Sequence, residues 1–318
     1  MSAGPAGHVT RSFDIPNSET ADRTLSGPPR TPLRRFLRTD DGVNIEAVYD
    51  PKSVVYNGPE DTGTPPSGHL ADRCGDRFDR ADHPEDRAGG RPLALVVAHG
   101  FTGDADRPYV RRVVEAFARH ASVVTFSFRG HGRSGGRSTV GDREVLDLAA
   151  AVRWARELGH TRVATVGFSM GGSVVLRHAA HPDAGTDAVV SVSAPARWYY
   201  RGTAPMRRVH WLITRPEGRL LGRYGFRTRI HHRDWDPVPL SPVESVPLIA
   251  PTPLLIVHGD RDGYFPLDHP EMLAAAAGDD GELWLERGMG HAENAASPEL
   301  LGRIGEWVVK GVAVRGVA

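Results

Sequence analysis

Short apolar runs alternate with amphipathic stretches along most of this chain. Leu93–Ala98 is a continuous apolar run, which is typical of a strand buried on both faces of a parallel sheet. Residues 109–120 follow, and their apolar positions fall on one helical stripe. The stripe in this helix consists of Val110, Val113, Val114 and Phe117. The stripe in the next predicted helix consists of Val145, Leu148, Val152 and Ala155. Further strands are predicted at 123–126, 162–166, Ala188–Val192, 254–257 and 282–285, and further helices at 142–158, 170–181 and 298–310. This alternation predicts an α/β fold with a doubly wound, mostly parallel sheet, whose ligand lies outside the carboxyl ends of the strands.

Other stretches depart from this alternation. Residues 36–39 and 43–49 alternate around Asp41-Gly42, which indicates a hairpin before the first parallel strand. Residues 1–30 are rich in small and turn-forming residues, so we expect a disordered N-terminal tail there. Residues 57–91 have few large apolar side chains and predict a flexible surface insertion. Cys74 lies in that insertion, and we expect it to be a structural or incidental thiol.

The segment 195–240 is too long for an ordinary connection, and we expect it to form a cap inserted over the site. Ten arginines lie between Arg197 and Arg233, together with several large aromatic residues. Arginine can pair with carboxylate or phosphate, and aromatic side chains can pack against an acyl chain. We therefore expect Arg207, Arg208, Trp211 and Tyr224 to bind substrate and to favour an acyl substrate with an anionic end. The alternative is that the aromatic residues only pack the insertion and the arginines form a solvated face.

Composition narrows the possible partners. Lys plus Arg and Asp plus Glu both number 39, so no net charge favours nucleic acid or an anionic membrane as a partner of the whole protein. A single cysteine excludes an internal disulfide and a cysteine-clustered metal site. The sequence has neither an apolar core of signal-peptide length near its start nor a run of membrane-spanning length. We expect a cytoplasmic protein without stable membrane insertion or nucleic-acid binding, and the sequence leaves its oligomeric state open.

The motif Gly167-Phe168-Ser169-Met170-Gly171 stands between a predicted strand and a predicted helix. A serine on such a sharp strand-to-helix turn is exposed at the end of the sheet, so Ser169 is a candidate nucleophile. The flanking glycines allow the strand and the helix to approach closely. The backbone N–H of Met170 then lies at a helix N-terminus, where an anion is favoured.

A serine nucleophile needs a base, and the base needs a group that orients it. His291 is the candidate base because it lies in a glycine-rich loop directly after the last predicted strand. The strand at 254–257 is followed by Asp260 and Asp262, either of which could orient that histidine. The order serine, acid, histidine along the chain is the one expected of a nucleophile-elbow fold.

Together these motifs resemble the α/β-hydrolase family of serine esterases, lipases and thioesterases, over most of residues 33–310 apart from the insertion at 57–91. Gly167–Gly171 matches the nucleophile elbow, and His99-Gly100-Phe101-Thr102-Gly103 matches the oxyanion loop. The resemblance implies that the amides of Phe101 and Met170 form the oxyanion hole. The loop from Gly259 to Pro266 resembles the family's acid loop, which favours Asp262 over Asp260. Within the family, the motifs are similar to those of cinnamoyl esterases and monoacylglycerol lipases with small caps.

The resemblance implies a single α/β-hydrolase domain over 31–318, carrying the insertion and the cap. Where many relatives have an aspartate before the Arg-Gly loop, this chain has Ser127, which changes the loop without touching the expected catalytic residues. His99 and His131 are expected to be structural or to line the pocket. No metal or cofactor is expected, because no ligand spacing is present and the chemistry needs none.

The expected activity is hydrolysis of a small-molecule carboxylic ester or thioester through an acyl-enzyme, with Ser169, Asp262 and His291 as the catalytic residues. An acyltransferase, a cofactor-free haloperoxidase or a carbon–carbon bond hydrolase would use the same residues. A non-catalytic ligand-binding protein on the same fold is a further alternative.

Overall fold

The computed structural model describes residues 31–53 and 92–314. The expected tail at 1–30 and the expected insertion at 57–91, with Cys74, lie outside the described residues. The described chain forms one sheet of eight strands in the order β1-β2-β4-β3-β5-β6-β7-β8, with β3 to β8 parallel and β1 and β2 antiparallel at one edge. The strands are β1 (Leu33–Arg38), β2 (Asn44–Asp50), β3 (Leu93–Ala98), β4 (Ser122–Phe126), β5 (Arg162–Phe168), β6 (Ala188–Val192), β7 (Leu254–Gly259) and β8 (Gly281–Glu286).

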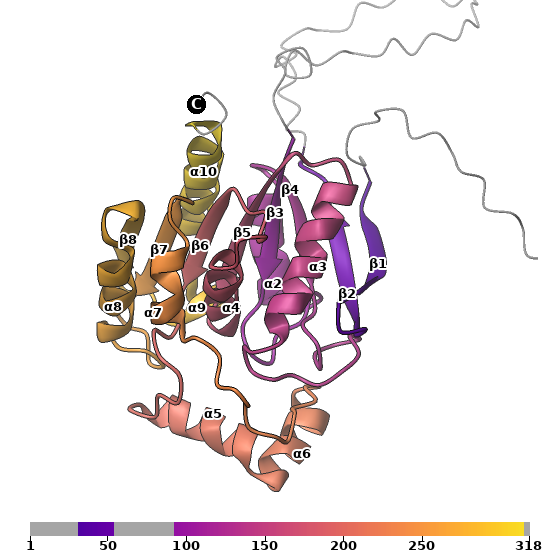
Figure 1. Cartoon of the computed structure of the whole chain (residues 1–318), viewed down its shortest axis with the longest axis vertical. Helices are drawn as coiled ribbons and strands as arrows, with labels where there is room; N and C mark the ends of the chain where they lie inside the picture. The colour runs from indigo at the N-terminus through magenta and orange to yellow at the C-terminus, as the bar shows by residue number, and fades with distance from the viewer. Residues whose placement is uncertain (1–30, 54–91, 315–318) are drawn as a thin grey trace, which may run out of the picture.

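Helices cover both faces of the sheet (Figure 1). One face packs against α3 (Glu144–Glu157), α4 (Met170–Ala179), α7 (Pro242–Ser245) and α8 (Asp268–Ala277). The other packs against α2 (Pro108–Phe117), α9 (Ala292–Ala295) and α10 (Pro298–Val314). Two short 3₁₀ turns, η1 (Val246–Leu248) and η2 (Gly278–Asp280), flank β7 and β8.

The continuous apolar run in β3 is explained by this double cover. Ala94, Val96 and Ala98 belong to the core on the α3–α4 side, whereas Leu95 and Val97 belong to the core on the α2–α10 side. Successive side chains of a strand point to opposite faces, so a strand with helices on both faces must be apolar at every position. The prediction of a doubly wound, mostly parallel sheet is therefore confirmed.

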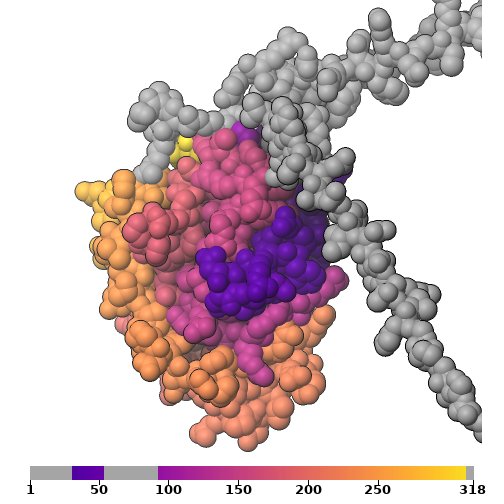
Figure 2. Space-filling view, turned by 45° about the vertical axis from the view of Figure 1, so that its right-hand side comes forward, coloured from indigo at the N-terminus to yellow at the C-terminus, as the bar shows by residue number. Residues whose placement is uncertain are grey.

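The hairpin predicted around Asp41-Gly42 is confirmed as β1 and β2. Gly42 has a φ of 82°, a left-handed conformation that glycine adopts without steric cost. The turn closes with hydrogen bonds between the backbones of Thr39 and Val43 and of Gly42 and Thr39, both at 2.9 Å. Figure 2 shows this hairpin, in indigo, on the surface of the molecule.

The apolar stripe predicted for α3 is confirmed at Leu148, Val152 and Ala155, which are buried. Val145 is only half-buried, while the acidic side chains of Glu144 and Asp147 are fully buried. Glu144 and Asp147 are buried because they bind polar groups of the loop after β4. Their partners build one wall of the site described below.

Residues 195–240 contain two helices, α5 (Ala204–Thr214) and α6 (Pro216–Gly225), which pack against each other at one end of the sheet (Figure 1). Thr203 begins α5 by accepting a hydrogen bond from the Met206 N–H, and its own hydroxyl donates to the Tyr264 carbonyl at 2.9 Å. On the other side, the Trp235 Nε1–H donates to the Thr139 carbonyl at 2.7 Å. These contacts attach the segment predicted as a cap to loops on both sides of it.

Candidate active site

Ser169 lies at the junction of β5 and α4 with φ 52° and ψ −113°, a strained conformation for a residue with a side chain. The glycines of the motif make this turn possible. A Cβ on Gly167 would overlap the Gly171 carbonyl, and a Cβ on Gly171 would overlap the Ala98 carbonyl of β3. The strand and helix therefore approach closely enough to expose the Ser169 hydroxyl above the end of the sheet.

His291 and Asp262 reach Ser169 from the loops after β8 and β7. The His291 Nε2 lies 2.9 Å from Ser169 Oγ, and its Nδ1 lies 2.7 Å from Asp262 Oδ2. Because a carboxylate only accepts hydrogen bonds, the Nδ1 carries the proton and Nε2 is free to accept the serine hydroxyl. The His291 ring is stacked on Tyr264, with ring centroids 4.2 Å apart. The structure thus brings together the three residues that the sequence predicted.

The Asp262 side chain is fully buried, and both of its oxygens accept hydrogen bonds. Its Oδ1 accepts the backbone N–H groups of Tyr264 and Phe265 at 2.8 and 3.1 Å. Burial opposes its negative charge, but the hydrogen bond from His291, the electrostatic interaction with that ring and these N–H groups outweigh that cost and lower the pKa of Asp262. Asp260 instead is exposed, and it accepts the Gly288 N–H at 2.6 Å.

Phe101 and Met170 are the residues expected to supply the oxyanion hole. Met170 is the first residue of α4, so its N–H has no partner within the helix. Within residues 31–53 and 92–314, neither N–H donates a hydrogen bond. Phe101, Met170 and Ser169 all line one cavity.

The cavity has a volume of about 710 Å³ and lies between the end of the sheet and the α5–α6 segment. Its lining has more apolar than polar surface, which suits an acyl group. Of the residues predicted to bind substrate, Trp211 and Arg208 line it. The structure does not bring Arg207 or Tyr224 to it: the Arg207 Nη1 donates to the Arg201 and Gly202 carbonyls, and the Tyr224 side chain is 75% exposed.

Comparison with known proteins supports the fold described above. A family model described as the alpha/beta hydrolase fold matches residues 94–208. The chain is 36% identical over 107 residues to the putative esterase YheT of Escherichia coli (strain K12), a match that spans only 32% of each protein. The solved structure of the Pyrococcus furiosus esterase Pf2001 is similar with a TM-score of 0.60 at 19% identity, covering 90% of this chain and 100% of that one. Est1E of Butyrivibrio proteoclasticus, solved with ferulic acid, is similar with a TM-score of 0.53 at 20% identity, covering 88% and 99%.

The chain has the α/β-hydrolase fold. In this α/β-hydrolase fold, Gly100 precedes Phe101, and its N–H donates to Glu293 Oε1 at 2.9 Å. Glu293 is 3% exposed, and burial raises its pKa. It joins the loop of His291 to the loop of Phe101. Sequence analysis missed this residue, and its one local signal is an acid among small apolar residues just after His291.

The two histidines expected to be structural or pocket-lining are structural. His99 and His131 are fully buried and do not line the cavity. His99 Nε2 accepts the Phe128 N–H at 3.1 Å, and His131 Nε2 accepts the Thr102 N–H at 3.3 Å. Burial lowers the pKa of His99 to about 3 and that of His131 to about 4, so both rings are neutral acceptors that support the oxyanion loop.

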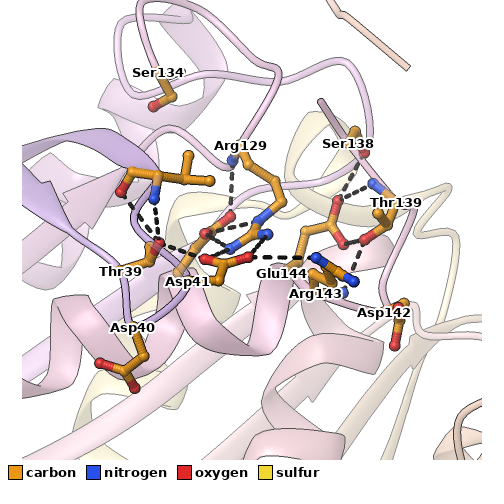
Figure 3. A network of polar contacts seen from close by, with 12 residues as sticks. Thr39, Asp40, Asp41, Arg129, Ser134, Ser138, Thr139, Asp142, Arg143 and Glu144 are labelled. Carbon is orange, nitrogen blue, oxygen red and sulfur yellow. Dashed lines mark hydrogen bonds and ion pairs between the residues drawn. The ribbon is translucent and has the colours of Figure 1, made fainter. Parts of the chain in front are cut away.

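The loop after β4 forms one wall of the cavity of this hydrolase fold and is held by buried acids (Figure 3). Arg129 contacts Asp147 at 2.8 Å and Asp41 at 2.7 Å. Glu144 accepts hydrogen bonds from the side chains of Ser138 and Thr139 at 2.8 and 2.6 Å. It also accepts the backbone N–H groups of Thr139, Val140 and Gly141.

Ser127, which replaces the aspartate of many relatives, takes part in the same local structure. Its Oγ accepts the Ala105 N–H at 3.1 Å, and its carbonyl accepts the Ser134 hydroxyl at 2.6 Å. These two hydrogen bonds hold Ser127 within the loop, and Ser127 does not line the cavity that contains Ser169.

Among the described residues, no group of three or more His, Cys, Asp or Glu side chains is placed to hold a metal ion. No helix in the described part of the chain has both the length and the apolar character needed to cross a bilayer.

Proposed function

We propose that this protein is a serine hydrolase that cleaves a carboxylic ester or thioester through an acyl-enzyme formed on Ser169. The observation that carries the proposal is the hydrogen-bonded chain from Ser169 Oγ through His291 to the buried Asp262, which opens into a largely apolar cavity. The likeness to the putative esterase YheT, to the esterase Pf2001 and to Est1E, which was solved with ferulic acid, supports the same class of reaction.

The roles follow from the positions of the protons. His291 Nε2 accepts the Ser169 hydroxyl proton as Oγ attacks the substrate carbonyl carbon. Asp262 keeps the proton on Nδ1 and stabilises the imidazolium that forms. His291 then donates its Nε2 proton to the leaving alcohol or thiol, and the same nitrogen later accepts a proton from the water that releases the acid.

The amides of Phe101 and Met170 stabilise the oxyanion of the tetrahedral intermediate. One such donor typically contributes a few kcal/mol, or about 10²–10³ in rate. Glu293 acts through Gly100 as a positioning residue, because its contact with the Gly100 N–H holds the loop that presents the Phe101 amide.

The test is turnover of p-nitrophenyl esters and acyl-CoA thioesters of increasing acyl length by the purified protein. We expect hydrolysis of at least one series, with kcat/KM rising until the acyl chain fills the cavity of about 710 Å³. Absence of turnover across both series, with the serine intact, would contradict the proposal.

Our second proposal concerns substrate preference, which we place at Arg208 on the cavity wall. We propose that this arginine favours an acyl substrate with an anionic end, because within the described residues it forms no ion pair. Its neighbour Arg207 has the same charge but lies off the cavity, so Arg207→Gln is a matched control.

The experiment compares kcat/KM for a neutral ester and for the matched ester with a free terminal carboxylate. Arg208→Gln should reduce the preference for the anionic ester, and added salt should weaken it because exposed charges are screened over roughly 8 Å at physiological ionic strength. The proposal is contradicted if Arg207→Gln and Arg208→Gln reduce the preference for the anionic ester equally, or if that preference changes with neither salt nor substitution. The arginines would then only form a solvent-exposed surface.

A further inference from the structure

Tyr264 lies two residues after Asp262 and contacts three separate parts of the molecule. Its backbone N–H donates to Asp262 Oδ1 at 2.8 Å. Its carbonyl accepts the hydroxyl of Thr203, the residue that begins α5, at 2.9 Å. Its ring is stacked on the ring of His291, with centroids 4.2 Å apart and planes inclined by 25°. One residue therefore contacts the acid, the base and the α5–α6 segment.

The stacked ring restricts the orientation of the imidazole. The hydrogen bond from Nδ1 to Asp262 fixes one point of the His291 ring, but the plane of the ring could still tilt about that point. Tyr264 lies against one face of the imidazole, and the Phe265 ring meets it at 62° with centroids 5.6 Å apart. These two rings oppose a tilt that would carry Nε2 away from its position 2.9 Å from Ser169 Oγ.

The Tyr264 ring also acts on the charge that the imidazole acquires during the reaction. The face of an aromatic ring carries partial negative charge, so a cation placed over it is attracted. In the proposed mechanism His291 becomes an imidazolium when it accepts the Ser169 proton. The stacked ring therefore stabilises the charged form of His291 more than the neutral form. The titratable groups that interact with this imidazole among the described residues include Asp262, Glu293 and His258.

Thr203 connects Tyr264 to the first turn of α5. Its Oγ accepts the Met206 N–H at 3.4 Å, which caps the helix, while its hydroxyl hydrogen is donated to the Tyr264 carbonyl. Met206 lines the active-site cavity, so this turn of α5 is part of the cavity wall. A shift of α5 would therefore break the hydrogen bond to Tyr264 or move the ring that lies against His291.

We propose that Tyr264 is a positioning residue for His291, and that its hydrogen bond with Thr203 makes the orientation of the base depend on the position of α5. The inference rests on the proposed function, because it concerns the base of the same site. Tyr264 acts through His291 and is not itself a proton donor or acceptor in the reaction. An α5 helix held in its observed place keeps Nε2 directed at Ser169, and a displaced α5 does not.

Comparison of Tyr264→Leu with Tyr264→Phe tests the role of the ring, with kcat and kcat/KM for a neutral ester measured as a function of pH. Both variants keep the two backbone contacts, and only phenylalanine keeps the aromatic face. We expect kcat to fall about fivefold or more in Tyr264→Leu. The acid limb of kcat/KM should also move to lower pH by about half a unit or more, because the imidazolium loses its stacked partner. Tyr264→Phe should stay within about twofold of the wild type, since the Tyr264 hydroxyl bonds to no described residue.

Phe226→Leu is the matched control, because Phe226 lines the same cavity but has no ring contact with His291. It should change KM and leave the acid limb in place. The proposal is overturned if Tyr264→Leu changes neither kcat nor the acid limb, or if it changes KM alone as the control does. A wild-type protein without turnover would instead contradict the proposed function, so the two failures are distinguishable.

A double-mutant cycle tests the connection to α5. Thr203→Val removes the hydroxyl that donates to the Tyr264 carbonyl and should lower kcat about threefold, whereas Thr203→Ser keeps the donor and should restore kcat. In the Tyr264→Leu background, Thr203→Val should change kcat by less than about 1.5-fold, because the ring through which it acts is gone. Equal effects in the two backgrounds would overturn the dependence on α5. The thermal midpoint of each variant checks that it is folded at the assay temperature, since Thr203 also caps α5.

Discussion

Replacing Asp262 by asparagine tests the hydrogen-bonded chain to Ser169, because the structure determines which way the new amide must face. Asp262 Oδ1 accepts the N–H groups of Tyr264 and Phe265 at 2.8 and 3.1 Å. An amide NH₂ group placed there would face two donors, so the amide oxygen must take this position. The NH₂ group then occupies the position of Oδ2, 2.7 Å from His291 Nδ1.

In that orientation the asparagine donates to Nδ1, and the ring proton moves to Nε2. The His291 Nε2–H would then point at Ser169 Oγ and could not accept its proton. In a serine protease the same change costs about 10⁴ in kcat for this reason, which corresponds to about 5.4 kcal/mol in the barrier. We expect a loss of this order in Asp262→Asn, with the fold retained.

The assay is kcat/KM for the best p-nitrophenyl ester, with Asp260→Asn as the matched control. Asp260 is exposed and contacts the Gly288 N–H, an interaction that the asparagine oxygen preserves, so we expect a change of less than about threefold. A larger loss in Asp260→Asn than in Asp262→Asn, or equal losses in the two variants, would refute the assignment of the acid.

Two other perturbations follow from the buried acids. Arg129→Met leaves the fully buried Asp147 without its cation and should lower the free energy of unfolding by about 3–5 kcal/mol, measured by urea denaturation. Burial raises the pKa of Asp147 to about 7 even beside Arg129, so the folded variant gains a proton more readily than the unfolded chain. The deficit should therefore shrink as the pH falls from about 8 to about 6, and a deficit independent of pH would contradict this cause. Glu293→Ala should lower kcat more than Glu293→Gln, because only Gln keeps an acceptor for the buried Gly100 N–H; equal kcat values in the two variants would remove Glu293 from its positioning role.

The sequence predicts those parts of the fold that depend only on residues close together in the chain. The apolar run Leu93–Ala98 implies a strand covered on both faces whatever the helices are, and the glycines around Ser169 are required by the turn itself. His291 was recognisable because a glycine-rich loop follows the last strand.

The remaining features of the site depend on contacts between segments that are distant in the chain. Two acids, Asp260 and Asp262, were candidates from the residues alone, and only the path of their loop shows which one contacts His291. Glu293 bonds to Gly100, which is 193 residues away in the chain. Arg207 and Arg208 are adjacent, so which one lines the cavity depends on how α5 lies against the sheet rather than on the local pattern.

The most direct test of the central proposal is covalent labelling with a fluorophosphonate, followed by peptide mass spectrometry to locate the label. We expect one label on Ser169, and we expect Ser169→Ala to lose both labelling and ester turnover while its thermal midpoint stays close to that of the wild-type protein. The strained turn accommodates alanine as readily as serine, so loss of activity could not be attributed to unfolding. Ester turnover at the wild-type rate in Ser169→Ala, or a label on another residue, would contradict the proposal that Ser169 is the nucleophile.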